Sequence, residues 1–192
     1  MNGHVFDLHA RGWHVANVNY PLCPEVTLTS LYQSLEQAFS AIISNCKKLG
    51  VSYGKVILGG HSAGGHAACW LAARPDIEPH VHGVFSVSGV YEMKPILSTS
   101  IQADVRASDE EIDRFDLIIH GRAPHPILAT MGADEPAAWL ASSRHWAQAM
   151  QGQNGNIRLE AIAHTNHFTV MDKSVATSSA FGALLEEFVG SV

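Results

Sequence analysis

The sequence lacks the features that mark several classes of protein. Its 12 lysines and arginines are outnumbered by 18 aspartates and glutamates, and the net charge of −6 leaves no basic footprint for nucleic acid or an anionic membrane. No apolar run approaches the length that spans a bilayer. The first residues also lack the basic region and the apolar core of a secretory signal. We therefore expect a cytoplasmic protein with no nucleic-acid or membrane partner.

Cysteine is scarce, and the histidines are scattered. The three cysteines, Cys23, Cys46 and Cys69, are widely spaced and form no Cys-x-x-Cys motif, so we interpret them as reduced core residues. The closest pairs among the 12 histidines have no carboxylate or cysteine partners at a recognised zinc spacing, and His-Glu-x-x-His does not occur. The sequence therefore predicts no metal site.

What the chain does contain is an alternation of strand and helix patterns over a single domain, residues 1–192. Short apolar runs predict strands, and apolar residues at a spacing of three and four predict amphipathic helices. The expected strands are 14–20, 55–58, 83–88, 126–131 and 157–163, and the expected helices are 3–11, 28–49, 67–73, 136–150 and a last helix around 181–188. This alternation favours an α/β fold with a mostly parallel sheet and helices on both faces.

Residues 91–125 break the alternation. They carry a charged patch between Asp104 and Asp116 and show no strand period. We interpret them as a short, helical, cap-like insertion that leans over the strand ends, where loops usually determine substrate selectivity.

Residues 59–66 read Gly-Gly-His-Ser-Ala-Gly-Gly-His and lie between a predicted strand and a predicted helix. A glycine-flanked serine in this context is typical of a nucleophile elbow. Gly60 and Gly64 leave the room that a sharp turn at Ser62 needs. The start of the helix adds a positive dipole end, and the N–H of Ala63 can point at a developing oxyanion. A glycine-rich loop with an incidental serine is the less favoured interpretation.

A nucleophile of this kind takes its acid and its base from loops after later strands, in the order serine, acid, histidine. Asp134 follows the strand predicted at 126–131, and His167 follows the strand predicted at 157–163. Open α/β sheets place their sites at these carboxyl ends of parallel strands. We therefore predict that Ser62 attacks a carbonyl, that His167 takes and returns its proton, and that Asp134 fixes the imidazole tautomer.

Three other residues compete for these roles. His164 precedes His167 by three residues and is the less favoured base. Glu135, next to Asp134, is expected to face solvent, and Asp172 is expected to cap the last helix. Three tryptophans at apolar helix positions are expected to belong to the core: Trp70, Trp139 and Trp146.

The chain from about Ala10 to Val189 resembles the esterase and lipase-like α/β hydrolases. The similarity lies in Gly-His-Ser-Ala-Gly-Gly-His at 60–66, Gly-Ala-Asp-Glu at 132–135 and Asn-His-Phe at 166–168. Tyr-Pro-Leu-Cys-Pro-Glu at 20–25 is similar to a stretch of the kynurenine formamidase (arylformamidase) branch. The resemblance implies a serine hydrolase with the triad named above and no cofactor. Its substrate would be a small acyl compound, either an aryl formamide such as N-formylkynurenine or a short-chain carboxylic ester, cleaved through an acyl-enzyme.

One part of the family pattern is absent. Such hydrolases carry a His-Gly-Gly segment after their third strand, which supplies further oxyanion donors, and the resemblance therefore implies a fold truncated at its N-terminus. We expect the strand at 14–20 to pair directly with the elbow strand, or a second chain to complete this sheet edge in a homodimer. Loss of one oxyanion donor lowers turnover by about 10²- to 10³-fold. The alternative function is thus a catalytically impaired hydrolase-fold protein that acts as a binding or assembly unit.

Overall fold

The computed structural model, which describes residues 3–172 and 179–192, is built on a four-stranded parallel sheet. The strands lie in the order β1 (Ile57–His61), β2 (Gly83–Val87), β3 (Ile127–Gly132) and β4 (Ile157–Ile162). β3 is buried along its whole length, whereas β1 and β4 at the two edges are partly exposed. A strand covered on both faces reads as a continuous apolar run, which is why β2 and β3 could be recognised in the sequence. The predicted parallel α/β sheet is confirmed.

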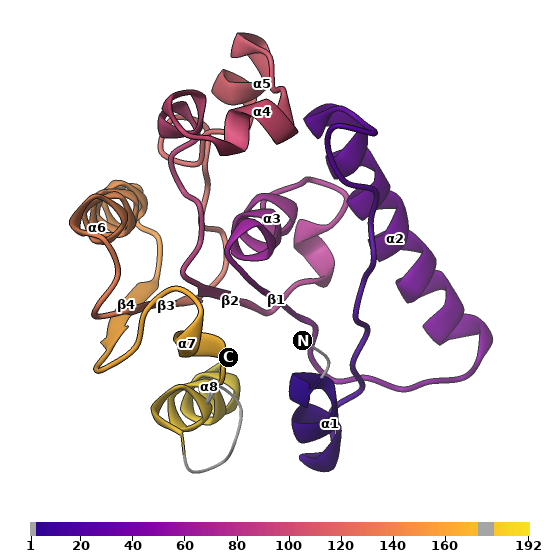
Figure 1. Cartoon of the computed structure of the whole chain (residues 1–192). Helices are drawn as coiled ribbons and strands as arrows, with labels where there is room; N and C mark the ends of the chain where they lie inside the picture. The colour runs from indigo at the N-terminus through magenta and orange to yellow at the C-terminus, as the bar shows by residue number, and fades with distance from the viewer. Residues whose placement is uncertain (1–2, 173–178) are drawn as a thin grey trace.

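Helices cover both faces of the sheet, as predicted (Figure 1). On one face α2 (Leu28–Lys48), α3 (Ala63–Ala72) and α6 (Ala137–Gly152) contribute to the larger hydrophobic core. The other face has a smaller core, to which three helices contribute: α1 (Gly3–Ala10), α7 (Thr169–Asp172) and α8 (Ala180–Ser191). The remaining elements are two 3₁₀ helices, η1 (Glu78–His80) and η2 (Lys94–Ser98), and two short helices, α4 (Ile101–Val105) and α5 (Asp109–Arg114).

The long helix α2 forms where the sequence places its apolar stripe. The hydroxyl of Thr27 accepts a hydrogen bond from the N–H of Ser30 and so caps the first turn. The last turn holds Lys47 and Lys48, whose charge complements the negative end of the helix. Six residues on one side of α2 are buried: Leu28, Leu31, Tyr32, Leu35, Phe39 and Ile43.

The strand predicted at 14–20 does not form. In the described part of the chain these residues have no regular structure, and β1 pairs with β2 alone. Val15 and Val18 still pack against the cores, so the apolar residues of this segment are partly buried without a neighbouring strand to bond. The prediction that this segment pairs directly with the elbow strand is therefore wrong. The other expectation, a second chain that pairs with the edge in a homodimer, stays a prediction.

The segment 91–125 contains three short helices, with η2, α4 and α5 following one another between residues 94 and 114. Ser108 and Glu111 form a capping box at the start of α5. The Glu111 carboxylate also accepts a hydrogen bond of 2.8 Å from the N–H of Thr29, which ties the segment to the first turn of α2. The buried carboxylate of Asp116 holds the same segment together, because it accepts hydrogen bonds from the N–H groups of Met93, Ile118 and Ile119.

His66, on the helix that follows the elbow, is a fully buried link between three parts of the fold. Its Nε2–H donates to the carbonyl of Phe115 over 2.7 Å. A carbonyl can only accept, so Nδ1 of the neutral ring is free to accept from the hydroxyl of Tyr32 on α2. This arrangement joins α3 to α2 and to the end of α5 through one neutral imidazole.

Burial makes the stability of the fold depend on pH through His66. Desolvation lowers the pKa of His66 to about 4, against the opposing effects of the Phe115 carbonyl and of Asp116. In the unfolded chain a histidine titrates near 6.5. The unfolded state therefore binds the extra proton first, so this contribution to the free energy of unfolding is complete above pH 6.5 and is lost as the pH falls towards 4.

We expect His66 to account for a loss of about 2 kcal/mol of stability between pH 7 and pH 5. Urea denaturation of the wild-type protein and of His66→Gln at both pH values measures this. A glutamine amide can donate to Phe115 and accept from Tyr32 without titrating, so the variant should lose about 2 kcal/mol less than the wild type. An equal loss in the two proteins would show that His66 does not stay neutral.

No helix among residues 3–172 and 179–192 combines the length and the apolar character needed to cross a membrane.

Candidate active site

Ser62 occupies the sharp turn between β1 and α3. Its backbone angles are φ 57° and ψ −122°, a conformation that side chains disfavour and that is typical of strained functional turns. The N–H of Ser62 donates to the carbonyl of Val87 on β2 over 2.8 Å, and its own carbonyl accepts from the N–H groups of Gly65 and His66. These bonds fix the turn from both sides, so the hydroxyl is held on a rigid part of the fold.

Two glycines make room for this turn. A Cβ at Gly60 would overlap the carbonyl group of Gly64, and a Cβ at Gly65 would lie 2.5 Å from Ser86 Oγ. By contrast, a Cβ at Gly64 would meet open space. The predicted need for a glycine at position 60 is confirmed, and the predicted need at position 64 is wrong. The second glycine that the packing requires is Gly65, because α3 packs its first turn directly on β2 through that position.

The side chain of His167 approaches Ser62 from the loop that follows β4. His167 Nε2 lies 3.1 Å from Ser62 Oγ. The loop is shaped locally by Asn166, whose side-chain oxygen accepts from the N–H groups of Phe168 and Thr169. His164, the competing candidate, is exposed and has a left-handed backbone with φ 59°. The structure therefore brings His167, and not His164, to the serine.

The carboxylate that faces His167 belongs to Glu135, not to Asp134. Glu135 Oε2 lies 3.7 Å from His167 Nδ1, and the Glu135 residue is only 5% exposed. Its other oxygen, Oε1, accepts from the hydroxyl of Ser88 and, over 2.9 Å, from the N–H of Gly132. Asp134 is exposed, and its contribution to the loop is the backbone N–H that donates to the Thr165 carbonyl. The expectation that Glu135 faces solvent is wrong.

The reason lies in the turn after β3. The N–H of Glu135 donates to the carbonyl of Gly132 while the Gly132 N–H donates to the Glu135 side chain, so the chain folds back over the strand end. Gly132 itself is packed on the base loop, where an added Cβ would meet the Thr165 carbonyl at 2.5 Å. The carboxylate at the third position after Gly132 is therefore turned inward, and the one before it points to solvent.

Glu135 is held in its charged form. Burial alone would raise the pKa of the Glu135 carboxyl, but the His167 imidazole and the hydrogen bonds from Ser88 and Gly132 together hold it below its usual value. The distance of 3.7 Å to His167 is within ion-pair reach and longer than a hydrogen bond. Such contacts are often long before substrate binds and tighten in the reacting complex.

Ala63, the predicted oxyanion donor, is the first residue of α3. The first N–H groups of a helix have no carbonyl partner within it, so this N–H belongs to the set that a ligand can use. The macrodipole of α3 adds partial positive charge at the same end, next to Ser62.

Aromatic side chains surround the candidate base. The ring of Trp139 lies edge-on to the His167 ring with centroids 4.9 Å apart, and Phe168 lies edge-on at 5.5 Å. Phe168 is 77% exposed. Trp146 is buried in the core as predicted, stacked on Tyr91. Trp139 is only partly buried and lines the site, so the prediction that it belongs to the core is wrong. It lies in the first turn of α6, at the end of the helix closest to Glu135.

Two other predictions concern residues outside this cluster. The last helix, α8, is capped by Ser179, whose hydroxyl accepts from the N–H of Gly182 over 2.9 Å, so the prediction that Asp172 caps it is wrong. In the described part of the chain no group of three or more histidine, cysteine, aspartate or glutamate side chains is placed to hold a metal ion.

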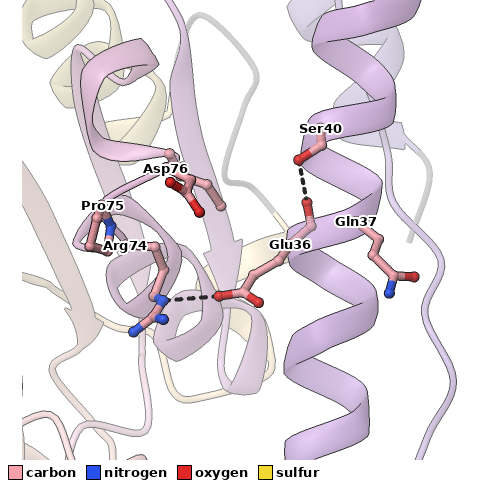
Figure 2. Close-up of a pocket in the computed structure, with 7 residues that line it drawn as sticks. Glu36, Gln37, Ser40, Arg74, Pro75 and Asp76 are labelled. Atoms are coloured by element: carbon pink, nitrogen blue, oxygen red, sulfur yellow. Dashed lines mark hydrogen bonds and ion pairs between the residues drawn. The ribbon is translucent and has the colours of Figure 1, made fainter.

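A surface hollow between α2 and the end of α3 offers no competing site (Figure 2). Its main polar groups already pair with one another, since Arg74 Nε donates to Glu36 Oε1 over 2.9 Å and Ser40 Oγ donates to the Glu36 carbonyl. Arg74 also lies over the ring of Trp70. The hollow is lined by other residues than the cluster around Ser62, and its ion pair is an ordinary surface contact of small energetic value.

The chain is similar in sequence to known proteins. Residues 8–139 match a family model described as the α/β hydrolase fold. Kynurenine formamidase of Danio rerio is 22% identical over 190 residues, which cover 94% of this chain and 64% of that protein. The chain thus spans less than two thirds of the length of this curated relative.

Solved structures of low sequence identity share the fold. Carboxyl esterase 2 of the fungus Tuber melanosporum superposes with a TM-score of 0.77 at 14% identity, over 97% of this chain and 70% of that one. The acetyl ester-xyloside bifunctional hydrolase of Caldicellulosiruptor lactoaceticus gives a TM-score of 0.71 at 15% identity, over 90% of this chain and 69% of that one.

Proposed function

The chain belongs to the α/β-hydrolase-fold family, and from that premise we propose that it is a serine hydrolase that cleaves a small acyl substrate through an acyl-enzyme. The observation that carries the proposal is the contact of 3.1 Å between Ser62 Oγ and His167 Nε2 on a strained strand-to-helix turn. A nucleophile within hydrogen-bond reach of a base, which a third group orients, is the arrangement that activates a serine.

The triad that we propose is Ser62, His167 and Glu135. The Glu135 carboxylate facing Nδ1 favours the tautomer with its proton on Nδ1, which leaves the lone pair of Nε2 for the Ser62 hydroxyl. When Nε2 takes the serine proton, the imidazole becomes positively charged, and the buried negative charge of Glu135 stabilises it.

The reaction has two steps, acylation and deacylation of Ser62. Ser62 Oγ bonds to the carbonyl carbon of the substrate, its proton passes to His167 Nε2, and the oxyanion accepts from the Ala63 N–H. The bond to the leaving amine or alcohol breaks, and His167 returns the proton to that group. A water molecule attacks the acyl-enzyme in the same way, so that the carboxylic acid is released and Ser62 recovers its proton.

The substrate class we propose is an aryl formamide, such as N-formylkynurenine, or a short-chain carboxylic ester. Two observations support an aromatic leaving group. The rings of Trp139 and Phe168 border His167, and offset or edge-on aromatic contacts favour a flat ring at such a place. A relative that covers 94% of the chain bears the name kynurenine formamidase. Beyond its carbonyl, a formyl group carries only a hydrogen and is the smallest acyl group.

Reaction with a fluorophosphonate tests the proposal. Attack of Ser62 Oγ on phosphorus with loss of fluoride should attach one phosphonate per folded chain, and peptide mass spectrometry should place it on Ser62. The matched controls are Ser62→Ala, which should take up no label, and Ser52→Ala, an exposed serine away from the site, which should label as the wild type does. Hydrolysis of N-formylkynurenine and of p-nitrophenyl acetate is measured on the same samples.

The outcomes separate the two candidate functions. Labelling at Ser62 with turnover supports the hydrolase, and the two rates decide between formamide and ester. Well-folded protein that takes up no label would overturn the proposal and favour the alternative, a hydrolase-fold protein that acts as a binding or assembly unit.

A further inference from the structure

His61, the residue before the candidate nucleophile, is bound to the backbone of the candidate base. Its Nε2 lies 2.8 Å from the carbonyl oxygen of His167. A carbonyl oxygen only accepts, so this Nε2 carries the proton and donates it. The two imidazole rings also face each other, with centroids 4.6 Å apart and planes tilted by 42°.

This hydrogen bond connects the strand that leads to Ser62 with the loop that carries His167. His61 is the last residue of β1 and is rigidly placed by the parallel ladder to β2, where it lies opposite Val87. His167 lies in a loop, beyond the end of β4. The strand residue His61 therefore holds the main chain of His167. The Nε2 atom of the same His167 lies 3.1 Å from Ser62 Oγ.

A second hydrogen bond also anchors this loop, and it ties the loop to a different part of the fold. The N–H of Asp134 donates to the Thr165 carbonyl over 2.9 Å, which ties the base loop to the turn that carries Glu135. The His61 bond ties the same loop to the elbow. The base loop is thus tied both to the turn that carries Glu135 and to the strand that leads to Ser62.

We propose that His61 is a positioning residue for the base, and that its Nε2–H holds the His167 backbone so that the imidazole stays in line with Ser62. This inference rests on the proposed function. His61 takes no proton from the substrate and acts only through His167. A displacement of about 1 Å at a reacting centre can cost about 10²-fold in rate, so loss of the anchor should act on kcat.

Three substitutions at this position test the proposal. Glutamine carries an amide nitrogen about as far from Cα as imidazole Nε2, asparagine carries the same amide too close to Cα, and leucine carries no donor. We expect His61→Gln to keep kcat within about threefold of the wild type, and His61→Asn and His61→Leu to lower it by about 10- to 100-fold with KM nearly unchanged. Because His61 does not touch the substrate, the factor should be the same for an ester and a formamide.

Each rate is expressed per active site, with the sites counted by fluorophosphonate labelling and the fold monitored by thermal unfolding. A purely structural role would lower the number of active sites or the unfolding temperature and leave kcat per site unchanged. If leucine prevents folding, the comparison of the two amides still decides. Equal kcat per site for glutamine and asparagine would overturn the proposal. An unlabelled and inactive wild type would instead signal failure of the proposed function.

Discussion

Replacing Ser62 by alanine should lower kcat for ester or formamide hydrolysis by about 10⁵- to 10⁶-fold, with little change in stability. The substitution removes the hydroxyl oxygen that lies 3.1 Å from His167 Nε2, and without it no acyl-enzyme can form. The backbone that holds the turn stays, since its hydrogen bonds are made by N–H and C=O groups. Any activity left would come from substrate binding and from the oxyanion donor at Ala63.

His167 should belong to the same unit. Members of a triad act together, so His167→Ala should cost about as much as Ser62→Ala, and the double variant should be no slower than either single one. Initial-rate kinetics on p-nitrophenyl acetate with all three proteins measure this, with Ser52→Ala as the unaffected control. A Ser62→Ala protein that keeps a tenth or more of the wild-type kcat would rule out the serine mechanism.

The fold could be predicted from the sequence because the signals for it are local. Four apolar runs and the helices between them repeat the strand-helix alternation, and that alternation dictates a parallel sheet with helices on both faces. The structure moves the bounds by only a few residues, as at β1, predicted at 55–58 and found at Ile57–His61. The elbow was equally local, since Ser62 and its glycines lie within one turn of chain.

The segment 14–20 shows where local signals stop. Its β-branched and aromatic residues are compatible with a strand, but a strand needs a neighbouring backbone to bond, and the neighbour is a property of the whole chain. In the described structure the segment keeps its apolar residues Val15 and Val18 against the cores without joining the sheet. The residue types of a segment indicate which side chains are buried, but they do not show which other segment its backbone pairs with.

The carboxylate that faces His167 was missed by one residue for a similar reason. Asp134 and Glu135 follow the same strand, have the same charge and lie at almost the same spacing from Ser62. Which of them turns inward depends on the closure of the turn on Gly132 and on the hydroxyl of Ser88, which comes from the end of β2. Neither contact can be read from spacing alone. The sequence therefore located the loop but favoured Asp134, because only the folded chain defines which of the two carboxylates turns towards His167.

This geometry leads to a sharp difference between two neighbouring substitutions. Glu135→Gln should lower kcat by about 10⁴-fold, whereas Asp134→Asn, its matched control one residue away, should leave kcat within about twofold of the wild type. The glutamine amide has no negative charge to stabilise the imidazolium, and its NH₂ group can face Nδ1 and favour the wrong tautomer. Asparagine at 134 is exposed and keeps the backbone N–H that donates to Thr165.

Steady-state kinetics on one ester and one formamide, with rates counted per labelled Ser62, distinguish the two carboxylates. Both variants should keep the wild-type fold, because glutamine can still accept from Ser88 and Gly132 through its amide oxygen. A large loss at Asp134 together with a small one at Glu135 would return the acid to the residue that the sequence favoured. In that case the contact of 3.7 Å between Glu135 and His167 would be a structural ion pair that the reaction does not use.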